Sequence, residues 1–87
     1  LIINFFIKNK FMSKIQIEKN PISVNIGRNI RYFRRMQDIT QAQLGKYFNL
    51  SAQQMHKYEN GDHDISCVRL LKIAEILKTS LADLLKS

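Results

Sequence analysis

The sequence has one cysteine, one proline, three glycines and no long apolar run among its 87 residues. A single cysteine, Cys67, excludes an internal disulfide framework and any zinc site built from several cysteines, and it suits a cytoplasmic protein. A membrane-spanning helix needs about 20 apolar residues, so we expect none here. With 45% hydrophobic residues, the chain is neither collagen-like nor disordered in composition. Its length fits one domain.

Acidic residues are also scarce. The chain has 14 Lys and Arg against 7 Asp and Glu, a formal net charge of +7, and most of the excess lies in residues 1–40. This balance indicates a polyanionic partner, nucleic acid first and an anionic membrane surface second, although a basic face can also be merely solvated. A chain of this size buries only about 60% of its unfolded surface. Little interior therefore remains for an enclosed active site.

The segment 1–12 is apolar at eight of its twelve positions. It lacks a basic region ahead of the apolar stretch and a small-residue cleavage site, so we do not interpret it as a secretory signal. Three interpretations stay open: an arm or edge strand packed on the domain or on a second subunit, a membrane-surface segment, or an extension upstream of a natural start at Met12. The pair Asn20-Pro21 marks the end of this tail. We therefore divide the chain into an N-terminal extension, 1–22, and a helical domain, 23–87.

From residue 23 onward the apolar pattern has the helical period. Ile26, Ile30 and Phe33, continued by Gln37, fall at i, i+4, i+7 and i+11, which predicts a helix from Ser23 or Val24 to Gln37. Two Ser/Thr-x-x-Gln capping boxes follow, beginning at Thr40 and at Ser51. The second helix should end near Asn49, which tolerates a left-handed backbone, with an apolar face of Leu44, Tyr47 and Phe48.

The third helix is predicted over 52–59, with Met55 and Tyr58 buried and a stop at Asn60-Gly61. Ser66 begins a fourth helix, and Ser80 with Asp83 caps a short fifth one. Apolar positions on these two helices are Leu70, Leu71, Ile73, Ala74, Leu77, Leu81, Leu84 and Leu85. No stretch alternates with period two, so the sequence predicts an all-α domain of five short helices.

The second and third predicted helices have the lengths and short connection of a helix-turn-helix. In that motif the second helix enters a DNA major groove about 12 Å wide while the first lies across the backbone. The run 40–61, TQAQLGKYFNLSAQQMHKYENG, resembles the phage-repressor/Cro type, also called the XRE type. The likeness includes Thr-Gln at the start, Leu44, Leu50-Ser51 and Tyr58-Glu59 with Asn60-Gly61 at the end, and it extends over about 26–85.

This resemblance implies a five-helix, lambda-repressor-like DNA-binding domain preceded by an N-terminal extension. It further implies a bacterial or phage transcriptional regulator of the repressor kind that binds double-stranded DNA, as a homodimer on a palindromic operator. Two positions depart from the family pattern. Gly45 stands where the family favours alanine, at a cost of about 1 kcal/mol in helix propensity, and Asn49 replaces the usual turn glycine.

By resemblance and geometry, the third helix presents its base-contacting residues to the groove: Ala52, Gln53, His56 and Lys57. Gln53 could bond adenine in a bidentate pair, and Ala52 could touch a thymine methyl group. DNA backbone contacts are assigned to Gln41, Ser51, Asn60 and Lys46, with Arg31 and Arg35 as looser candidates. The family also pairs two residues of the first and third helices, here Arg34 and Glu59, in a partly buried ion pair.

The remaining reactive residues indicate no chemistry. His63 lies in Asp62-His63-Asp64, but three adjacent ligands rarely converge on one ion, so we expect a loop and no metal site. Cys67 is expected to be a small residue in or beside the core, and Tyr32, Tyr47 and Tyr58 to be packing residues. No acid/base, nucleophile or cofactor-binding constellation is present, and we predict that the protein is not an enzyme.

Two other functions remain open. An antitoxin of the same fold would bind a protein partner as well as its own promoter, and a protein-interaction module would not bind DNA at all. For a homodimer, the candidate contact surfaces are the N-terminal segment and the fifth helix with Leu81, Leu84 and Leu85.

Overall fold

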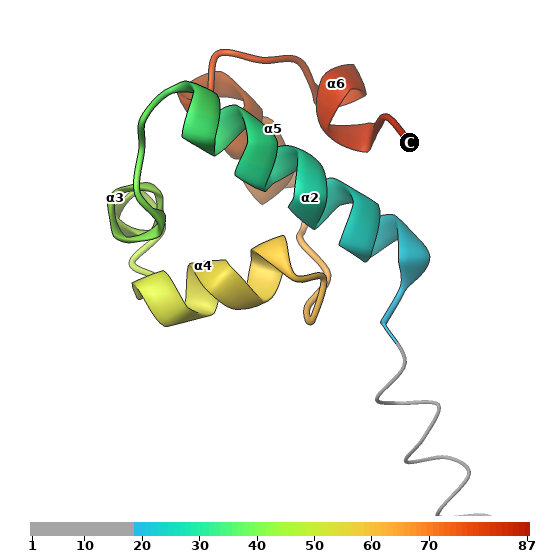
Figure 1. Ribbon diagram of the computed structural model, residues 1–87, viewed down its shortest axis with the longest axis horizontal. Coiled ribbons are helices and arrows are strands. Elements are labelled where there is room, and N and C mark those ends of the chain that lie inside the picture. The colour runs from blue at the N-terminus through green and yellow to red at the C-terminus, as the bar shows by residue number, and fades with distance from the viewer. Residues whose placement is uncertain (1–18) are drawn as a thin grey trace, which may run out of the picture.

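The computed structural model describes residues 19–87, so the expectations about 1–12 and a start at Met12 lie outside the described residues. All regular structure in 19–87 is helical, which confirms the all-α fold class. In Figure 1, α2 crosses the middle of the domain, with α3 and α4 on one side and α5 and α6 on the other. No described helix is long and apolar enough to cross a membrane. The helices are α2 (Pro21–Met36), α3 (Gln41–Lys46), α4 (Ala52–Glu59), α5 (Cys67–Ile76) and α6 (Leu81–Leu85).

The start of α2 differs from the sequence prediction. We expected the helix to begin at Ser23 or Val24, but it begins at Pro21. Asn20 is its N-cap, and the side-chain oxygen of Asn20 accepts a hydrogen bond from the Ile22 N–H at 2.9 Å. Proline is favoured at the first helical position because its fixed φ suits a helix and its missing N–H would have had no partner there. Asn20-Pro21 is therefore a helix start and not the end of a tail.

The other four helix starts agree with the predicted caps. Thr40 and Ser51 both form complete capping boxes, in which the hydroxyl accepts from the third backbone N–H and the glutamine side chain returns the bond. Ser66 caps α5 and Ser80 caps α6 through the hydroxyl alone, which accepts from the third backbone N–H without a returning side-chain bond. Such caps stabilise a helix by about 1 kcal/mol each. Short helices need this, because helices of fewer than about 12 residues are marginal in isolation.

Four of the helices end in the same backbone motif. A residue two or three positions beyond the end of each helix has a positive φ: 55° at Asp38, Asn49 and Lys78, and 76° at Gly61. The N–H that follows each of them bonds back across the helix end, for example Thr79 N–H to Ala74 O at 2.9 Å. This is the Schellman arrangement, which gives the last carbonyls a partner. The left-handed conformation expected at Asn49 is confirmed.

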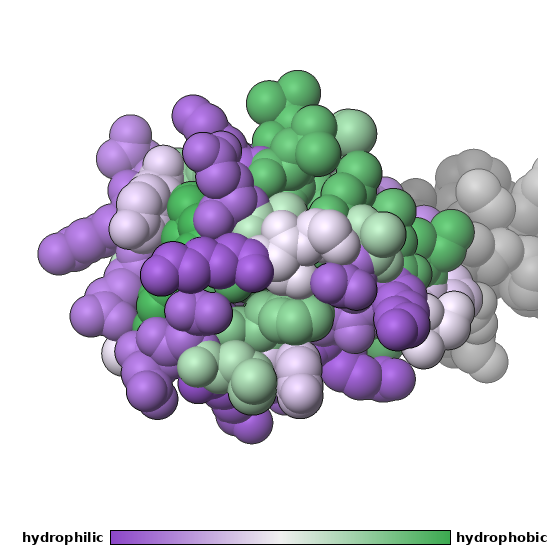
Figure 2. Space-filling view, turned by 90° about the horizontal axis from the view of Figure 1, so that it is seen from above, coloured by the Kyte–Doolittle hydropathy of each residue, from purple (hydrophilic) through white to green (hydrophobic). Residues whose placement is uncertain are grey.

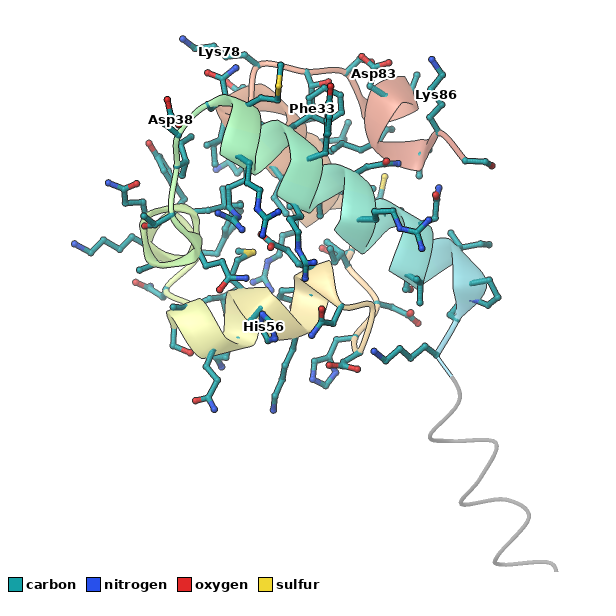
Figure 3. All side chains as sticks on the ribbon, in the orientation of Figure 1. Phe33, Asp38, His56, Lys78, Asp83 and Lys86 are labelled. Carbon is teal, nitrogen blue, oxygen red and sulfur yellow. The ribbon has the colours of Figure 1, made fainter. Side chains whose placement is uncertain are left out.

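Lys78 is the most unfavourable residue type among these four positions, and its side chain lies at the turn between α5 and α6 (Figure 3). A lysine in the left-handed region costs about 1 kcal/mol relative to glycine. We expect Lys78→Gly to raise the free energy of unfolding by about 0.5–1 kcal/mol, measured by urea denaturation. Lys72→Gly, at an exposed site inside α5, is the matched control and should lower it by about 1 kcal/mol. Loss of stability in both variants would contradict the prediction.

The core lies between α2 and the four shorter helices. Its fully buried side chains are Ile30, Leu44, Met55, Ile73, Leu77 and Leu84. Each helix contributes at least one of them, so no helix can be removed without opening the core. Arg69 of α5 closes one edge: its guanidinium donates to the Tyr58 hydroxyl at 2.8 Å and lies 5.5 Å from the centre of the Phe48 ring.

Several residues expected in the core are exposed. Tyr47 is 65% exposed and Tyr32 is 58% exposed, so only Tyr58 of the three tyrosines is a packing residue. Leu71 is about half exposed, and Cys67 lies at the exposed start of α5. The expected periods were correct, but the apolar residues exceed what the core of a small domain can cover. The prediction that these residues are buried, which rested only on their apolar character, is therefore wrong.

Two glycines allow close approaches that the sequence did not indicate. A Cβ at Gly27 would lie 2.5 Å from the carbonyl oxygens of both Tyr58 and Glu59, so α2 crosses directly against the end of α4. A Cβ at Gly45 would overlap the Leu50 carbonyl oxygen. Glycine instead of alanine at position 45 therefore allows the tight turn between α3 and α4. The lower helix propensity of glycine is the cost of this contact.

Candidate nucleic-acid interface

Helices α3 and α4 form the helix-turn-helix pair, and α4 has two distinct faces. Met55 and Glu59 are buried on the side that packs against α2 and α3. Ala52, Gln53 and Lys57 are exposed on the other side. Three of the four residues assigned to base contacts therefore share an exposed polar face on one helix. The fourth, His56, is also exposed but has side-chain partners within the domain.

A buried ion pair joins α2 to α4. Arg34 Nε donates to Glu59 Oε2 at 2.6 Å and its second nitrogen donates to Glu59 Oε1 at 3.0 Å. The remaining guanidinium nitrogen donates to the Ile39 carbonyl oxygen at 2.9 Å, in the turn before α3. The Glu59 side chain is fully buried. This bidentate geometry holds α2, α4 and the start of α3 in one arrangement.

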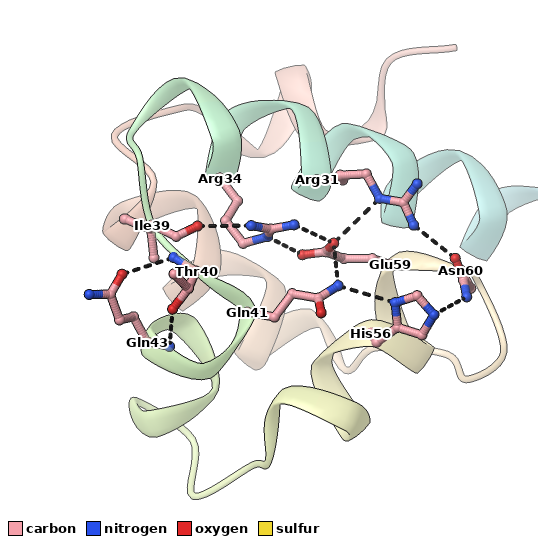
Figure 4. Close-up of polar contacts among 9 residues, drawn as sticks. All are labelled: Arg31, Arg34, Ile39, Thr40, Gln41, Gln43, His56, Glu59 and Asn60. Atoms are coloured by element: carbon pink, nitrogen blue, oxygen red, sulfur yellow. Dashed lines mark hydrogen bonds and ion pairs between the residues drawn. The ribbon is translucent and has the colours of Figure 1, made fainter.

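Glu59 also belongs to a closed cycle of five side chains, which we call the polar ring (Figure 4). Gln41 Nε2 lies 3.1 Å from Glu59 Oε1 and 3.2 Å from His56 Nδ1. His56 Nε2 lies 2.9 Å from Asn60 Nδ2, and Asn60 Oδ1 accepts from Arg31 at 2.9 Å. Arg31 Nε closes the cycle at 3.5 Å from Glu59 Oε1. Two residues assigned to backbone contacts, Gln41 and Asn60, are thus linked through His56.

Sequence reasoning missed most of this ring. Arg31 was only a loose candidate, yet it contacts both Asn60 and Glu59. The one local signal is the i, i+4 spacing of His56 and Asn60, which places two side chains on one helix face. The other contacts join residues 15 to 29 positions apart. No pattern in a single sequence reports such contacts.

The remaining assigned residues lie around this site. Ser51 caps α4, and Lys46 is exposed at the end of α3. His63 lies in a loop, where its ring and the Tyr58 ring form a T-shaped pair, while Asp64 accepts a hydrogen bond from the Ser23 hydroxyl. Within 19–87 no group of three or more His, Cys, Asp or Glu side chains could hold a metal ion. The loop interpretation of His63 agrees with its position.

Known proteins are similar to this chain in sequence and in fold. The helix-turn-helix family model matches residues 30–84. A protein of Sinorhizobium fredii described as an uncharacterized HTH-type transcriptional regulator is 35% identical over 65 residues, which are 75% of this chain and 46% of that protein. The chain therefore spans about half the length of this curated relative.

Two solved structures have the same fold. The clp gene regulator ClgR from Corynebacterium glutamicum superposes with a TM-score of 0.70 at 24% identity, over 78% of this chain and 72% of that one. The DNA-binding domain of BldD from S. venezulae superposes with a TM-score of 0.66 at 20% identity, over 77% of this chain and all of that domain. The helix order, the two capping boxes and the family match agree: the chain belongs to the helix-turn-helix family, in its phage-repressor/Cro (XRE) type.

Proposed function

We propose that this domain is a transcriptional regulator that binds double-stranded DNA sequence-specifically through α4. The observation that carries the proposal is the exposed polar face of α4, which is held on the core by Met55 and Glu59 and begins at a capped, exposed N-terminus. A helix of eight residues presented in this way can enter a major groove. The descriptions of the matching relative as a transcriptional regulator and of the BldD domain as DNA-binding support the same function.

Base recognition is assigned to three residues of this face, Ala52, Gln53 and Lys57. Gln53 has one amide oxygen and one NH₂ group, which match the N6 and N7 edge of adenine in the major groove. Ala52 offers a methyl group toward a thymine methyl, and Lys57, one turn further along, can reach guanine or a phosphate. All three side chains are exposed on α4.

Backbone contacts are assigned to residues at the edges of α4. Ser51 lies at its start and Asn60 directly after its end, while Gln41 and Lys46 belong to α3. Amide, hydroxyl and ammonium groups are common donors to phosphate oxygens, and such contacts fix the position of a protein on the duplex without reading its sequence. The proposal therefore separates residues that select a sequence from residues that bind any duplex.

This division gives a direct test. Gln53→Ala is expected to reduce discrimination at one base pair by ~1–3 kcal/mol while leaving binding to random DNA nearly unchanged. Gln41→Ala should weaken binding to all duplexes alike, and because glutamine is neutral it should leave the salt slope of log K unchanged. Selection of an operator from a random library, followed by titrations at two salt concentrations, measures both effects. Equal losses on every duplex for both variants would overturn the assignment of Gln53 to base recognition.

We further propose that two copies bind a palindromic operator. Recognition helices of such dimers lie about one helical turn of DNA apart, roughly 34 Å. A surface for this contact is the groove where Ile22 and Val24 of α2 lie beside Leu85 of α6. Figure 2, which looks onto the domain from above, shows apolar side chains gathered on one part of the surface. Of the leucines assigned to the dimer, Leu84 is fully buried in the core, so Leu85, 46% exposed, and the half-buried Leu81 remain.

Repression is the regulatory sense that we propose. A dimer bound over a promoter would exclude RNA polymerase by occupying the same duplex.

Sedimentation or light scattering with and without a selected operator measures the number of copies bound. Leu85→Lys should then weaken binding to the two-half-site operator more than to a single half-site, and an equal effect on both would contradict the proposed dimer surface.

A further inference from the structure

The polar ring has more hydrogen-bond donors than acceptors around His56, and Gln41 supplies one of these donors. Its NH₂ group lies 3.1 Å from Glu59 Oε1. Both carboxylate oxygens of Glu59 accept hydrogen bonds from the Arg34 guanidinium, so they act as acceptors and not as donors. The NH₂ group of Gln41, and not its oxygen, must therefore point in this direction. The same NH₂ group lies 3.2 Å from His56 Nδ1.

The amide of Asn60 is oriented by a cation, whereas that of Gln41 is oriented by a carboxylate. Its Oδ1 lies 2.9 Å from the guanidinium of Arg31, which has donors only. The oxygen of Asn60 must face Arg31, so its NH₂ group faces His56 Nε2 at 2.9 Å. Both amides are thus fixed by a charged neighbour. Both direct N–H donors at the imidazole of His56.

A neutral imidazole cannot accept both of these bonds. One of its nitrogens is an acceptor and the other carries a hydrogen, so one of the two contacts places an N–H against an N–H. The cluster therefore has one acceptor too few. A phosphodiester group supplies acceptor oxygens without donors on every nucleotide, whereas the adenine and cytosine edges present donors in the major groove.

We propose that one phosphate of the DNA backbone completes the polar ring, and that His56 binds this phosphate in its protonated form and does not read a base. The proposal rests on the DNA-binding function proposed above. A protonated imidazole has no acceptor, so it releases both amides and adds two N–H donors of its own. Charge-assisted hydrogen bonds to phosphate are stronger than neutral ones.

The charged groups around the polar ring come from α2 and the segment before it, from α4 and from the turn after α4. Arg31 and Arg34 face the ring from α2, and Glu59 and Lys57 belong to α4, with His56. Lys19, which precedes α2, donates to the Asn60 carbonyl oxygen and pairs with Asp62 in the turn after α4. Gln41 of α3 is neutral. The Glu59 carboxylate already faces two arginines. A further cation therefore needs a further anion, which the phosphate provides.

The consequence is a DNA affinity that rises as pH falls. Histidine gains its proton between about pH 8 and pH 5, so we expect the dissociation constant to fall roughly threefold to tenfold between pH 7.5 and pH 5.5. Because the contact is to phosphate, the same change should appear on a selected operator and on a duplex of random sequence.

The chain offers a matched control, because it has only two histidines. Fluorescence anisotropy titrations at constant ionic strength would compare the full chain with His56→Gln and His63→Gln on both duplexes. His56→Gln keeps a polar side chain that can accept from both amides but cannot titrate, so its affinity should be independent of pH. His63→Gln, in the loop, should keep the pH dependence of the unaltered chain. A neutral methylphosphonate at the contacted phosphate should abolish that dependence.

Other results would overturn the proposal. A pH dependence that survives in His56→Gln would assign the proton elsewhere, and a dependence seen on the operator alone would make His56 a base-reading residue. Binding that does not change with pH would exclude a protonated contact while leaving the proposed DNA-binding function intact. Failure of the unaltered chain to bind either duplex at any pH and low salt would remove both the function and this inference.

Discussion

Replacing Glu59 with alanine is expected to lower the free energy of unfolding by about 3–5 kcal/mol, the largest single effect that we predict. The reason is the guanidinium of Arg34, which would remain buried without its carboxylate partner. Arg31 and Gln41 would lose an acceptor in the same step. Because small domains have only about 5–15 kcal/mol of stability in total, the variant should be partly unfolded at moderate temperature. Urea denaturation followed by circular dichroism measures the loss.

A double variant separates the charge effect from the loss of packing. Arg34→Met with Glu59→Leu removes both buried charges and keeps the side-chain volume, and replacing a buried ion pair with apolar residues is often neutral or stabilising. We expect it to recover at least half of the loss seen in Glu59→Ala. A loss below about 1 kcal/mol in the single variant would show that the pair is not buried as the structure has it.

Replacing Gly27 with valine should cost about 3 kcal/mol, although glycine is a poor residue for the middle of a helix. A side chain at this position would overlap two backbone carbonyl oxygens at the end of α4, those of Tyr58 and Glu59. Backbone atoms cannot rotate away, so α2 and α4 would have to separate. The shift would also lengthen the contacts between Arg34 and Glu59.

The adjacent residue provides the control. Arg28 is exposed on the same helix, and Arg28→Val should change stability by less than about 1 kcal/mol. Thermal unfolding of the two variants under the same conditions makes the comparison. If Gly27→Val were as stable as Arg28→Val, the close crossing of α2 and α4 would be wrong. If it were folded but no longer bound DNA, the crossing would be shown to position α4.

Much of the fold could be predicted because its signals are local. Ser, Thr and Gln at fixed spacings specify where α3 and α4 begin, since each capping bond joins residues three apart. Asn49 and Gly61 mark helix ends because few other residues adopt a positive φ easily. The same kind of local rule failed at Asn20-Pro21, where a helix start was interpreted as the end of a tail.

The net charge predicted the kind of partner but not which basic residues face it. It indicated a polyanionic partner, and the most basic part of the described chain is α2 with its four arginines. The structure gives two of these arginines internal partners, because Arg34 binds Glu59 and Arg31 binds Asn60. Charge counted along a sequence cannot separate residues that neutralise a buried carboxylate from residues that face a ligand.

The sequence by itself determined the class of domain, the ends of most helices and the polar residues that α4 exposes, because those depend on spacings of three to four residues. Only the tertiary structure decided which apolar residues the core covers, why Gly27 must lack a side chain, and how Gln41, His56 and Asn60 come together. The contacts of Gly27 and of Gln41 join residues 15 to 32 positions apart, and contacts over such separations arise only when the helices pack. The scarcity of acceptors around His56 is of this kind, since it follows from the two charged neighbours that orient the amides of Gln41 and Asn60.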